Sequence, residues 1–256
     1  MINFSQSLSG FVVGVIVGLT GVGGGSLMTP LLVLLFGIHP VTAVGTDLLH
    51  ASITKAGGTY VHAKKKRVDW RISLLLAAGS LPAAIITILG LHFFTGGLGS
   101  SKIITTTLGF ALILTAVALA LHSRMRHFSE VRDGDVVPRH PGFTIAAGAV
   151  LGVLVSLSSV GAGALGISAL IFLYPRLAPQ RIVGSDLAHA VPLTLVAGVG
   201  HWAFGDVNWT LLLSLLVGSL PGIYIGSHLV GYIPQKILRG ILIAMLLLIG
   251  GRLLVF

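Results

Sequence analysis

The chain of 256 residues has no cysteine and few charged side chains. Without cysteine the protein has no disulfides, no thiolate metal sites and no cysteine nucleophile. Charged residues make up 9% of the sequence, whereas a water-soluble domain usually carries about 25%. Apolar residues make up 54%, and glycine occupies 35 positions. This composition excludes an ordinary soluble domain and is typical of a polytopic helical membrane protein, in which small residues let helices approach closely.

Acidic residues are also scarce, so the net charge is +9. The basic residues are concentrated in one short loop, 64–71, and in a polar linker, 122–141, and both segments flank apolar runs. Lysine and arginine gather in the cytoplasmic loops of membrane proteins. We therefore interpret the basic charge as a sign of membrane orientation, and we expect no nucleic-acid partner.

Apolar runs of roughly the 20 residues that span a bilayer as a helix recur along the chain. They predict an all-α, multi-pass protein of the cell (inner) membrane. The predicted apolar segments are 8–37, 42–62, 70–94, 101–122, 142–174, 181–202, 208–230 and 234–255.

The second half of the sequence repeats the first. Segment 44–82 recurs without a gap as 183–221, with 15 identities in 39 aligned positions, and further upstream 14–25 matches 152–163. Internal duplication around buried ionisable groups is typical of secondary transporters. The predicted organisation is a first membrane repeat (1–122), a cytoplasmic linker (123–141) and a second membrane repeat (142–256).

Equivalent loops of the two repeats differ in charge. Loop 64–71 holds five basic residues, whereas its counterpart 203–210 holds none. The bias is reversed for the preceding loops, because 36–41 has no lysine or arginine and 174–181 has two arginines. This pattern favours two halves that lie inverted in the membrane. A parallel arrangement with eight crossings is the alternative.

Inversion requires an odd number of crossings in each half. Four apolar segments per half give an odd number if the first segment enters and leaves on the same side of the membrane. Glycine and serine interrupt these first segments at 21–26 and 158–163, and Thr29-Pro30 is expected to interrupt the first segment again. The flanking pieces, of about 11 to 14 residues, are too short to cross alone. We therefore predict in each half a glycine-broken re-entrant hairpin followed by three transmembrane helices, with both termini outside.

The two glycine-rich breaks are candidates for a binding site. A half-helix that starts after such a break exposes unpaired N–H groups and the positive end of its dipole. Two such ends facing each other would bind an anion, and nearby hydroxyls would add donors. The alternative is that the glycines only allow a bent helix to pack tightly. The hydroxyls near the breaks belong to Ser26, Thr29, Ser158, Ser159 and Ser168.

The stretch GVGGGSLMTPLLVLLFGIHPVTAVGTDLLHA (21–51) resembles the signature of the TauE/SafE sulfite exporter family, also called the 4-toluene sulfonate uptake permease family. The shared pattern is a glycine-rich run, a nearby proline and a later A-V-G-T. The second copy keeps VGAG (160–163) and has Ser185 in place of Thr46. The resemblance implies transport of sulfite or organosulfonates, driven by an ion gradient. The breaks and the resemblance together indicate these substrate-binding residues: Gly23, Gly24, Gly25, Ser26, Thr29, Thr46, Ser158, Ser159, Gly161, Gly163 and Ser185.

An aspartate and a histidine recur at the same place in both repeats. Asp47 and His50 in the first repeat, and Asp186 and His189 in the second, lie inside predicted spans. The aspartates depart from the resembled family, in which many members carry serine there. Ionisable residues within a membrane are costly and indicate functional sites. Spaced by three residues, each pair shares a helical face and suits the carrying of protons, although a buried pair that only holds helices together has the same pattern.

Lys55 has no counterpart in the second half, where Thr194 stands. One interpretation is that it neutralises Asp47 or contacts an anionic substrate. The other is that its side chain extends toward the cytoplasmic face near Lys64. We include Lys55 with the two Asp–His pairs as candidate coupling residues.

The sequence thus predicts a secondary transporter of a small sulfur-containing anion of the sulfite or organosulfonate type, coupled to protons. An enzyme is not expected, because no nucleophile motif accompanies the serines and histidines. The predicted partners are the small anionic substrate, the lipid bilayer and, in a homo-oligomer, further copies of the chain; no cofactor and no resident metal are expected. Two alternatives stay open: an anion channel, and a divalent metal-ion transporter in which the paired Asp and His side chains bind the metal.

The charge pattern makes a topology prediction that a cysteine-free chain is well suited to test. A single cysteine introduced at Lys65 or Pro179 should react with a membrane-impermeant maleimide only from the cytoplasmic side, and one at Asp206 only from outside. The cysteine-free parent controls for background labelling. Labelling of Pro179→Cys only from outside would instead support the parallel arrangement with eight crossings.

Overall fold

The computed structural model describes residues 4–20, 25–95, 101–125, 141–229 and 235–255. Within these ranges the regular secondary structure is entirely helical, so the all-α prediction is confirmed. The helices are α1 (Phe4–Thr20), α2 (Gly25–Leu34), α3 (Pro40–Lys64), α4 (Trp70–Thr95), α5 (Ser101–Met125), α6 (Pro141–Ser158), α7 (Ala164–Leu173), α8 (Pro179–Ala203), α9 (Trp209–His228) and α10 (Gln235–Val255).

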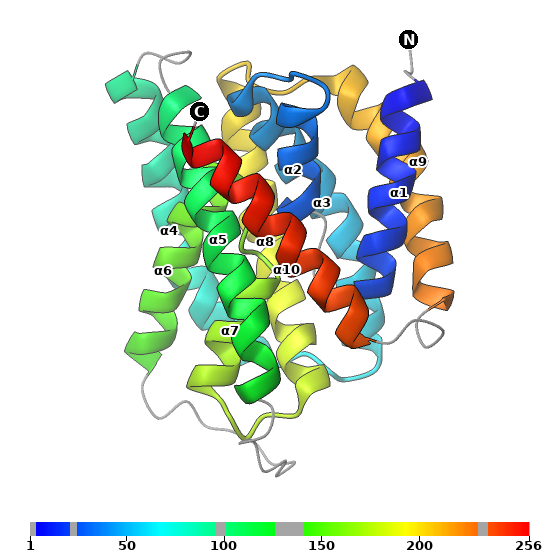
Figure 1. Cartoon of the computed structure of the whole chain (residues 1–256). Coiled ribbons are helices and arrows are strands. Elements are labelled where there is room, and N and C mark those ends of the chain that lie inside the picture. The colour runs from blue at the N-terminus through cyan, green and yellow to red at the C-terminus, as the bar shows by residue number, and fades with distance from the viewer. Residues whose placement is uncertain (1–3, 21–24, 96–100, 126–140, 230–234, 256) are drawn as a thin grey trace.

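The equivalent helices α3 and α8 pack against each other and run in opposite directions. The backbone N–H of Asn208, just after α8, donates to Thr46 near the start of α3. In the same way, the N–H of Asp69, just after α3, donates to Ser185 near the start of α8. Each helix therefore ends beside the beginning of the other. Antiparallel equivalent helices are what inverted repeats require, and both chain ends lie at one end of the molecule (Figure 1).

The loops 64–71 and 174–181, with five and two basic residues, meet at the opposite end. Arg181, in the first turn of α8, places Nη2 3.0 Å from Oδ2 of Asp69, which precedes α4. The loops 64–71 and 174–181 are therefore neighbours, although they belong to different halves. This is the grouping that the charge pattern predicts for two loops on one side of the membrane.

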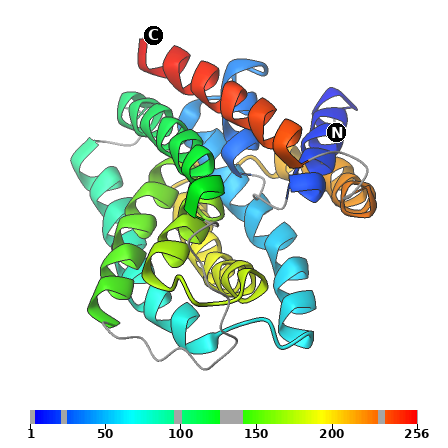
Figure 2. The same ribbon diagram turned by 60° about the horizontal axis from the view of Figure 1, so that its bottom comes forward.

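Helices of one half pack mainly against helices of the other. α1 lies beside α9, and α6 lies beside α4, on opposite sides of the molecule (Figures 1 and 2). These two pairs are equivalent in the repeat, since α6 corresponds to α1 and α9 to α4. The halves are thus interlocked, and neither could keep its packing without the other.

Glycine makes these two contacts possible. A Cβ on Gly79 of α4 would lie 1.9 Å from the carbonyl oxygen of Ile145 in α6, and one on Gly218 of α9 would lie 1.8 Å from that of Ser7 in α1. Such distances are far inside van der Waals contact, so only glycine fits. Gly79 and Gly218 open the duplicated GSLP motif, which explains why this motif recurs in both repeats.

The first apolar segment of each half forms a hairpin of two unequal helices. The second arms, α2 and α7, have 10 residues each, whereas the first arms, α1 and α6, have 17 and 18. The prediction of uniformly short pieces is therefore wrong for the first arms. Thr29-Pro30 does not interrupt α2 either, because Pro30 lies inside that helix; a membrane protein tolerates this when neighbouring groups satisfy the freed backbone.

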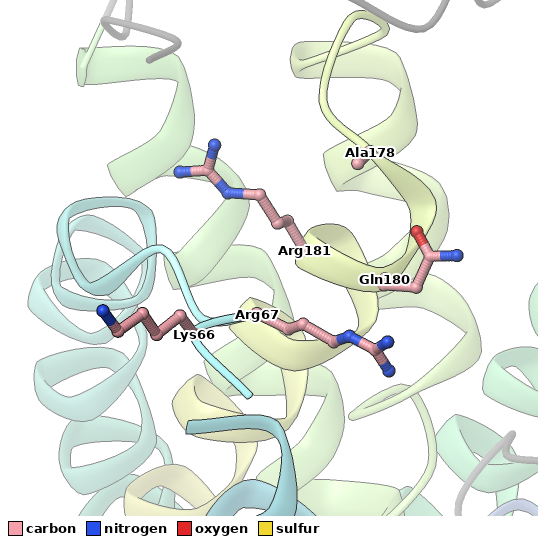
Figure 3. A pocket seen from close by; sticks show the side chains of 5 residues that line it. All are labelled: Lys66, Arg67, Ala178, Gln180 and Arg181. Atoms are coloured by element: carbon pink, nitrogen blue, oxygen red, sulfur yellow. The ribbon is translucent and has the colours of Figure 1, made fainter. Parts of the chain in front are cut away.

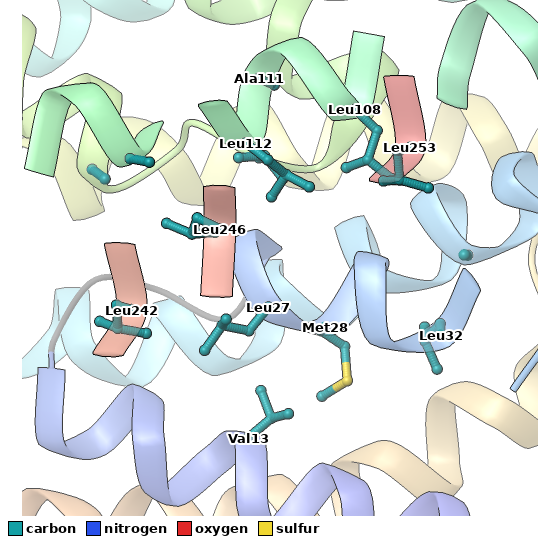
Figure 4. Close-up of a cluster of buried hydrophobic side chains, with 14 of the residues drawn as sticks. Val13, Leu27, Met28, Leu32, Leu108, Ala111, Leu112, Leu242, Leu246 and Leu253 are labelled. Atoms are coloured by element: carbon teal, nitrogen blue, oxygen red, sulfur yellow. The ribbon is translucent and has the colours of Figure 1, made fainter. Parts of the chain in front are cut away.

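The short helix α2 is held in place by apolar side chains. Leu27, Met28 and Leu32 are buried and pack in one cluster with residues of α1, α5 and α10 (Figure 4). The short helix α7 is buried likewise, with Leu165, Leu170 and Ile171 in a second cluster with α4, α6 and α8. One side of each half-helix is therefore buried in protein, as the preceding broken backbone requires at membrane depth, whereas Phe172 at the end of α7 is exposed.

Five of the described helices combine the length and hydropathy needed to cross a bilayer: α4, α5, α6, α8 and α9. Trp70 and Trp209, the first residues of α4 and α9, are exposed. An exposed tryptophan at a helix end is typical of the membrane–water interface. The structure is therefore that of a multi-pass membrane protein.

The close contact at Gly79 predicts a sharp sensitivity to one added methyl group. Gly79→Ala should lower the midpoint of thermal unfolding in detergent, because overpacking a tight helix contact costs about 1–3 kcal/mol. Gly57→Ala is the matched control, since a Cβ there meets nothing within 4 Å and alanine favours the helix. Equal midpoints for the two variants would show that α4 and α6 do not pack as described.

Candidate functional site

Two aspartate–histidine pairs lie in the interior, one on each of the central helices. Asp47 and His50 are buried on α3, and Asp186 and His189 are buried on α8. The spacing of three residues places both members of a pair on one side of their helix. The structure therefore removes all four ionisable side chains from water, as their position in apolar spans predicts.

Each histidine is bonded to a serine from the other half of the chain. His50 Nε2 lies 2.7 Å from Ser219 Oγ, and His189 Nε2 lies 2.8 Å from Ser80 Oγ. The two serines belong to the duplicated GSLP motif, so the two bonds are equivalent in the repeat. These serines were not among the predicted site residues. The signal that could have found them is that GSLP and Asp-Leu-x-His are duplicated together.

The two aspartates have different surroundings. Asp47 Oδ2 accepts a hydrogen bond of 2.6 Å from the hydroxyl of Thr29 in α2, and Asp47 Oδ1 lies 3.5 Å from His50 Nδ1. Asp186 has no hydrogen bond to any described residue, and its Oδ1 is buried. Its carboxylate packs on the first turn of α7, where a Cβ on Gly166 would lie 1.8 Å from Oδ1.

Lys55 points into the protein and does not extend to the cytoplasmic face. Its side chain is only 5% exposed. The ammonium donates to the backbone carbonyl of Ala162, which lies in the break between α6 and α7. Its strongest charge interaction is with Asp186, followed by Asp47. The structure thus places a cation of the first half at the broken helix of the second.

The backbone of this break is unusual over residues 159–163. Gly161 and Gly163 have φ angles of 113° and 148°, which only glycine adopts readily, and Ser159 has a φ of 58°. The chain turns here so that α7 can begin within the interior. The hydroxyl of Ser159 is buried and has no partner among the described residues. A buried hydroxyl without a partner is costly, so Ser159 has an unused capacity for a hydrogen bond in the interior.

Two other hydroxyls near the break are bonded to the backbone. Ser158 Oγ donates to the carbonyl of Leu154 at 2.6 Å and accepts from the N–H of Val160 at 3.2 Å. Ser168 Oγ donates to the carbonyl of Ala164 at 2.8 Å. These serines shape the ends of α6 and α7, and of the predicted serines at this break only Ser159 presents an unbonded hydroxyl.

The glycine-rich break of the first half lies largely outside the described residues. This concerns Gly23 and Gly24, which precede α2, and the side chain of Ser26; Gly25 is the first residue of α2. From this half, Thr29 is the predicted hydroxyl whose position is described, and it is bonded to Asp47.

Thr46 and Ser185 are not brought together with the buried lysine. Their hydroxyls accept from the N–H groups of Asn208 and Asp69 at 3.1 and 2.8 Å, respectively. Both acceptors therefore lie at the turns that begin α9 and α4. The place of Thr46 in A-V-G-T, and of Ser185 in the second copy, is explained by this contact between the halves.

The paired Asp and His side chains do not converge on one point. Among the described residues, no three His, Asp or Glu side chains lie close enough together to hold a metal ion. Ligation by at least three such groups is usual for protein metal sites. The arrangement of the described side chains thus gives the metal-transport alternative no preformed site.

A surface pocket at the opposite end from the chain termini is lined by Lys66, Arg67 and Arg181 together with Ala178 and Gln180. The cationic ends of these side chains point in different directions (Figure 3). Arg181 is also bonded to Asp69. Because the charges do not converge, we interpret them as determinants of membrane orientation.

Comparisons with known proteins agree with this architecture. The family described as "Sulfite exporter TauE/SafE" matches residues 7–253. The chain is 39% identical over 255 residues to the "Probable membrane transporter protein YjnA" of Bacillus subtilis (strain 168), covering 98% of this chain and all of that protein. It is 28% identical over 260 residues to YdhB of the same organism, also named a probable membrane transporter protein, with 96% of this chain and 97% of the relative covered.

A more distant relative comes from an archaeon. The "Probable membrane transporter protein MJ0441" of Methanocaldococcus jannaschii is 27% identical over 241 residues, covering 89% of this chain and 85% of the relative. No solved structure matches the chain. The duplicated helices, the buried ionisable pairs and the match over nearly the whole length lead to one conclusion: this protein is a membrane transporter that belongs to the TauE/SafE sulfite exporter family.

Proposed function

We propose that this protein is a proton-coupled secondary transporter of a small sulfur-containing oxyanion, of the sulfite or organosulfonate type, in the inner cell membrane. The observation that carries the proposal is the position of Lys55, whose buried ammonium is bonded at the break before α7. A cation at membrane depth is costly unless it is used or compensated. Here it lies where the N-terminus of a helix already favours negative charge.

The anion site is built by three kinds of donor. The N–H groups of Ala164 and Leu165 begin α7 and have no intrahelical partner, whereas the N–H of Gly166 donates to the carbonyl of Gly161. The Ser159 hydroxyl is 2% exposed and unbonded, and Lys55 supplies a full positive charge. A tetrahedral or pyramidal oxyanion presents several acceptor oxygens to such a set, and charge-assisted hydrogen bonds are strong where water is excluded.

The proposed transport motion follows from the packing. One apolar core is built mainly by α1, α2, α5, α9 and α10, and another by α4, α6, α7 and α8. Each core thus combines helices of both halves. We propose that the two groups of helices that form these cores rock against each other about the antiparallel pair of α3 and α8. The site would then open first to one side of the membrane and then to the other.

Removal of the buried cation tests the proposed site. Lys55→Met should weaken anion binding to the purified protein by tenfold or more, about the 1.5–3 kcal/mol of a hydrogen bond to a charged group. Lys55→Arg, which keeps the charge, should retain part of the affinity. Lys102→Met is the matched control, because Lys102 is exposed at the start of α5.

Isothermal titration calorimetry of the purified wild-type protein should compare the binding of sulfite, sulfate, thiosulfate, taurine, acetate and divalent cations. We expect binding of one or more sulfur oxyanions, and saturable accumulation against a gradient in proteoliposomes. Binding of divalent cations without any anion would refute the proposal in favour of metal transport. Flux that neither saturates nor concentrates the anion would support a channel.

The role of the Ser159 hydroxyl in anion binding is tested by replacing Ser159 with a residue that adopts its positive φ angle. Ser159→Gly removes the hydroxyl and also accommodates the positive φ, so the unfolding midpoint should stay the same or rise. Anion affinity should fall about 3- to 10-fold, the value of one hydrogen bond. Ser168→Ala is the control, since that hydroxyl is bonded to the backbone; an equal loss of affinity in both variants would place the anion elsewhere.

A further inference from the structure

We infer that the two copies of Asp-Leu-x-His have diverged in role: Asp186 carries the coupled proton and shares the Lys55 cation with the substrate, whereas Asp47 is a structural acceptor. This inference rests on the proposed anion transport and assigns its coupling to one half of the duplicated site. It replaces the expectation that both aspartates serve alike, and the expectation that Asp47 is the main partner of Lys55.

The two Asp–His pairs share the bonds of their histidines and the positions of their aspartates, so they can be compared residue by residue. Both histidines are bonded through Nε2 to the serine of the opposite GSLP motif, at nearly the same distance. Both aspartates occupy the same position on antiparallel helices. A difference between the pairs therefore reflects the residues around them and not a different frame.

The first difference lies on the short helices. Thr29 of α2 donates to Asp47, whereas the hydroxyl of Ser168 in α7 donates to the carbonyl of Ala164 and not to Asp186. Gly166, which has no side chain, lets the Asp186 carboxylate pack on the first turn of α7. Asp47 thus has an internal hydrogen-bond donor, and Asp186 does not.

The second difference is the cation. Lys55 of α3 interacts more strongly with Asp186 than with Asp47, and its counterpart on α8 is the neutral Thr194. Asp186 lies three residues before His189, whose ring is bonded to Ser80 of α4, and Gly166 of α7 lies against its carboxylate. The charge of Lys55, whose ammonium is bonded to Ala162 just before α7, therefore acts on the Asp186 carboxylate, which packs on the first turn of the same helix.

These contacts place the substrate and Asp186 in competition. Both would lie by the N-terminal end of α7, and both are compensated by the ammonium of Lys55. Without substrate, one carboxylate and one ammonium balance. A bound monovalent anion adds one negative charge, and an uncompensated charge at membrane depth is costly. Uptake of one proton by Asp186 restores the balance, so anion and proton would bind together.

The inference is tested by counting protons. Methanesulfonate is a suitable probe, because it stays a monovalent anion across the pH range and brings no titratable proton. On its addition to the purified protein in weakly buffered detergent solution, the wild type should take up about one proton per bound anion, measured with a pH-sensitive dye. Binding by the wild type without proton uptake would overturn the inference while leaving anion binding intact.

Two variants distinguish the halves. Asp186→Asn should abolish proton uptake and gradient-driven accumulation in proteoliposomes, yet retain binding and exchange of the anion across the membrane. Asp47→Asn should retain proton uptake and accumulation, with a lowered unfolding midpoint. Thr29→Val, which removes the donor to Asp47, should behave like Asp47→Asn. Asp186→Ser is a second, smaller variant for use if the asparagine clashes with α7.

The outcomes separate this inference from the proposed function. Loss of proton uptake in Asp47→Asn with retention in Asp186→Asn would reverse the assignment and overturn the inference. Equal loss in both would also overturn it, because the two sites would then share the role. Failure of the wild type to bind any sulfur oxyanion would instead refute the proposed function itself.

Discussion

The structure depends on one contact in the interior, between the charged side chain of Lys55 and the interrupted backbone between α6 and α7. Water is not available there to bind either group. The break between α6 and α7 frees a carbonyl at Ala162, and the ammonium of Lys55 binds it. The same break starts α7 inside the protein, so its N–H groups form a region of positive potential. The cation from α3, the start of α7 and the Ser159 hydroxyl thus lie together at this break, where protein groups must compensate the interrupted backbone.

The frame around this site is held by contacts between backbones. Glycines equivalent in the repeat let α1 approach α9 and α6 approach α4, and a Cβ on Gly14 or Gly152 would lie 2.5 or 2.4 Å from the carbonyl oxygens of Ser219 and Ser80, respectively. These are the serines that bind the two histidines. The tight helix contacts therefore also fix the position of the polar groups, and the two functions of the GSLP motif explain why it recurs as a unit.

Duplication supplies two copies of this frame, but the chemistry within it has not stayed symmetric. Alternating access by inverted halves needs equivalent helices, whereas binding one small anion needs only one cation. Membership of the TauE/SafE family agrees with a small anionic cargo. The buried Lys55 has the neutral Thr194 as its counterpart, and the contacts of the two aspartates differ: Thr29 donates to Asp47, whereas Asp186 packs on Gly166.

The sequence by itself determined the helices, the repeat and the glycine-rich breaks, because these depend on composition, periodicity and internal similarity along the chain. It also placed the buried Asp–His pairs and, through loop charge, favoured the antiparallel arrangement of α3 and α8. It underestimated the length of α1 and α6, since α1 begins at Phe4, ahead of the predicted apolar segment, and α6 runs from Pro141 to Ser158 at the start of the break. Only the tertiary structure decided that Ser219 meets His50, that Lys55 reaches Ala162 and that Asp186 packs on Gly166. The first two contacts join residues 169 and 107 positions apart, and local pattern contains no information on which distant side chains packing will bring together.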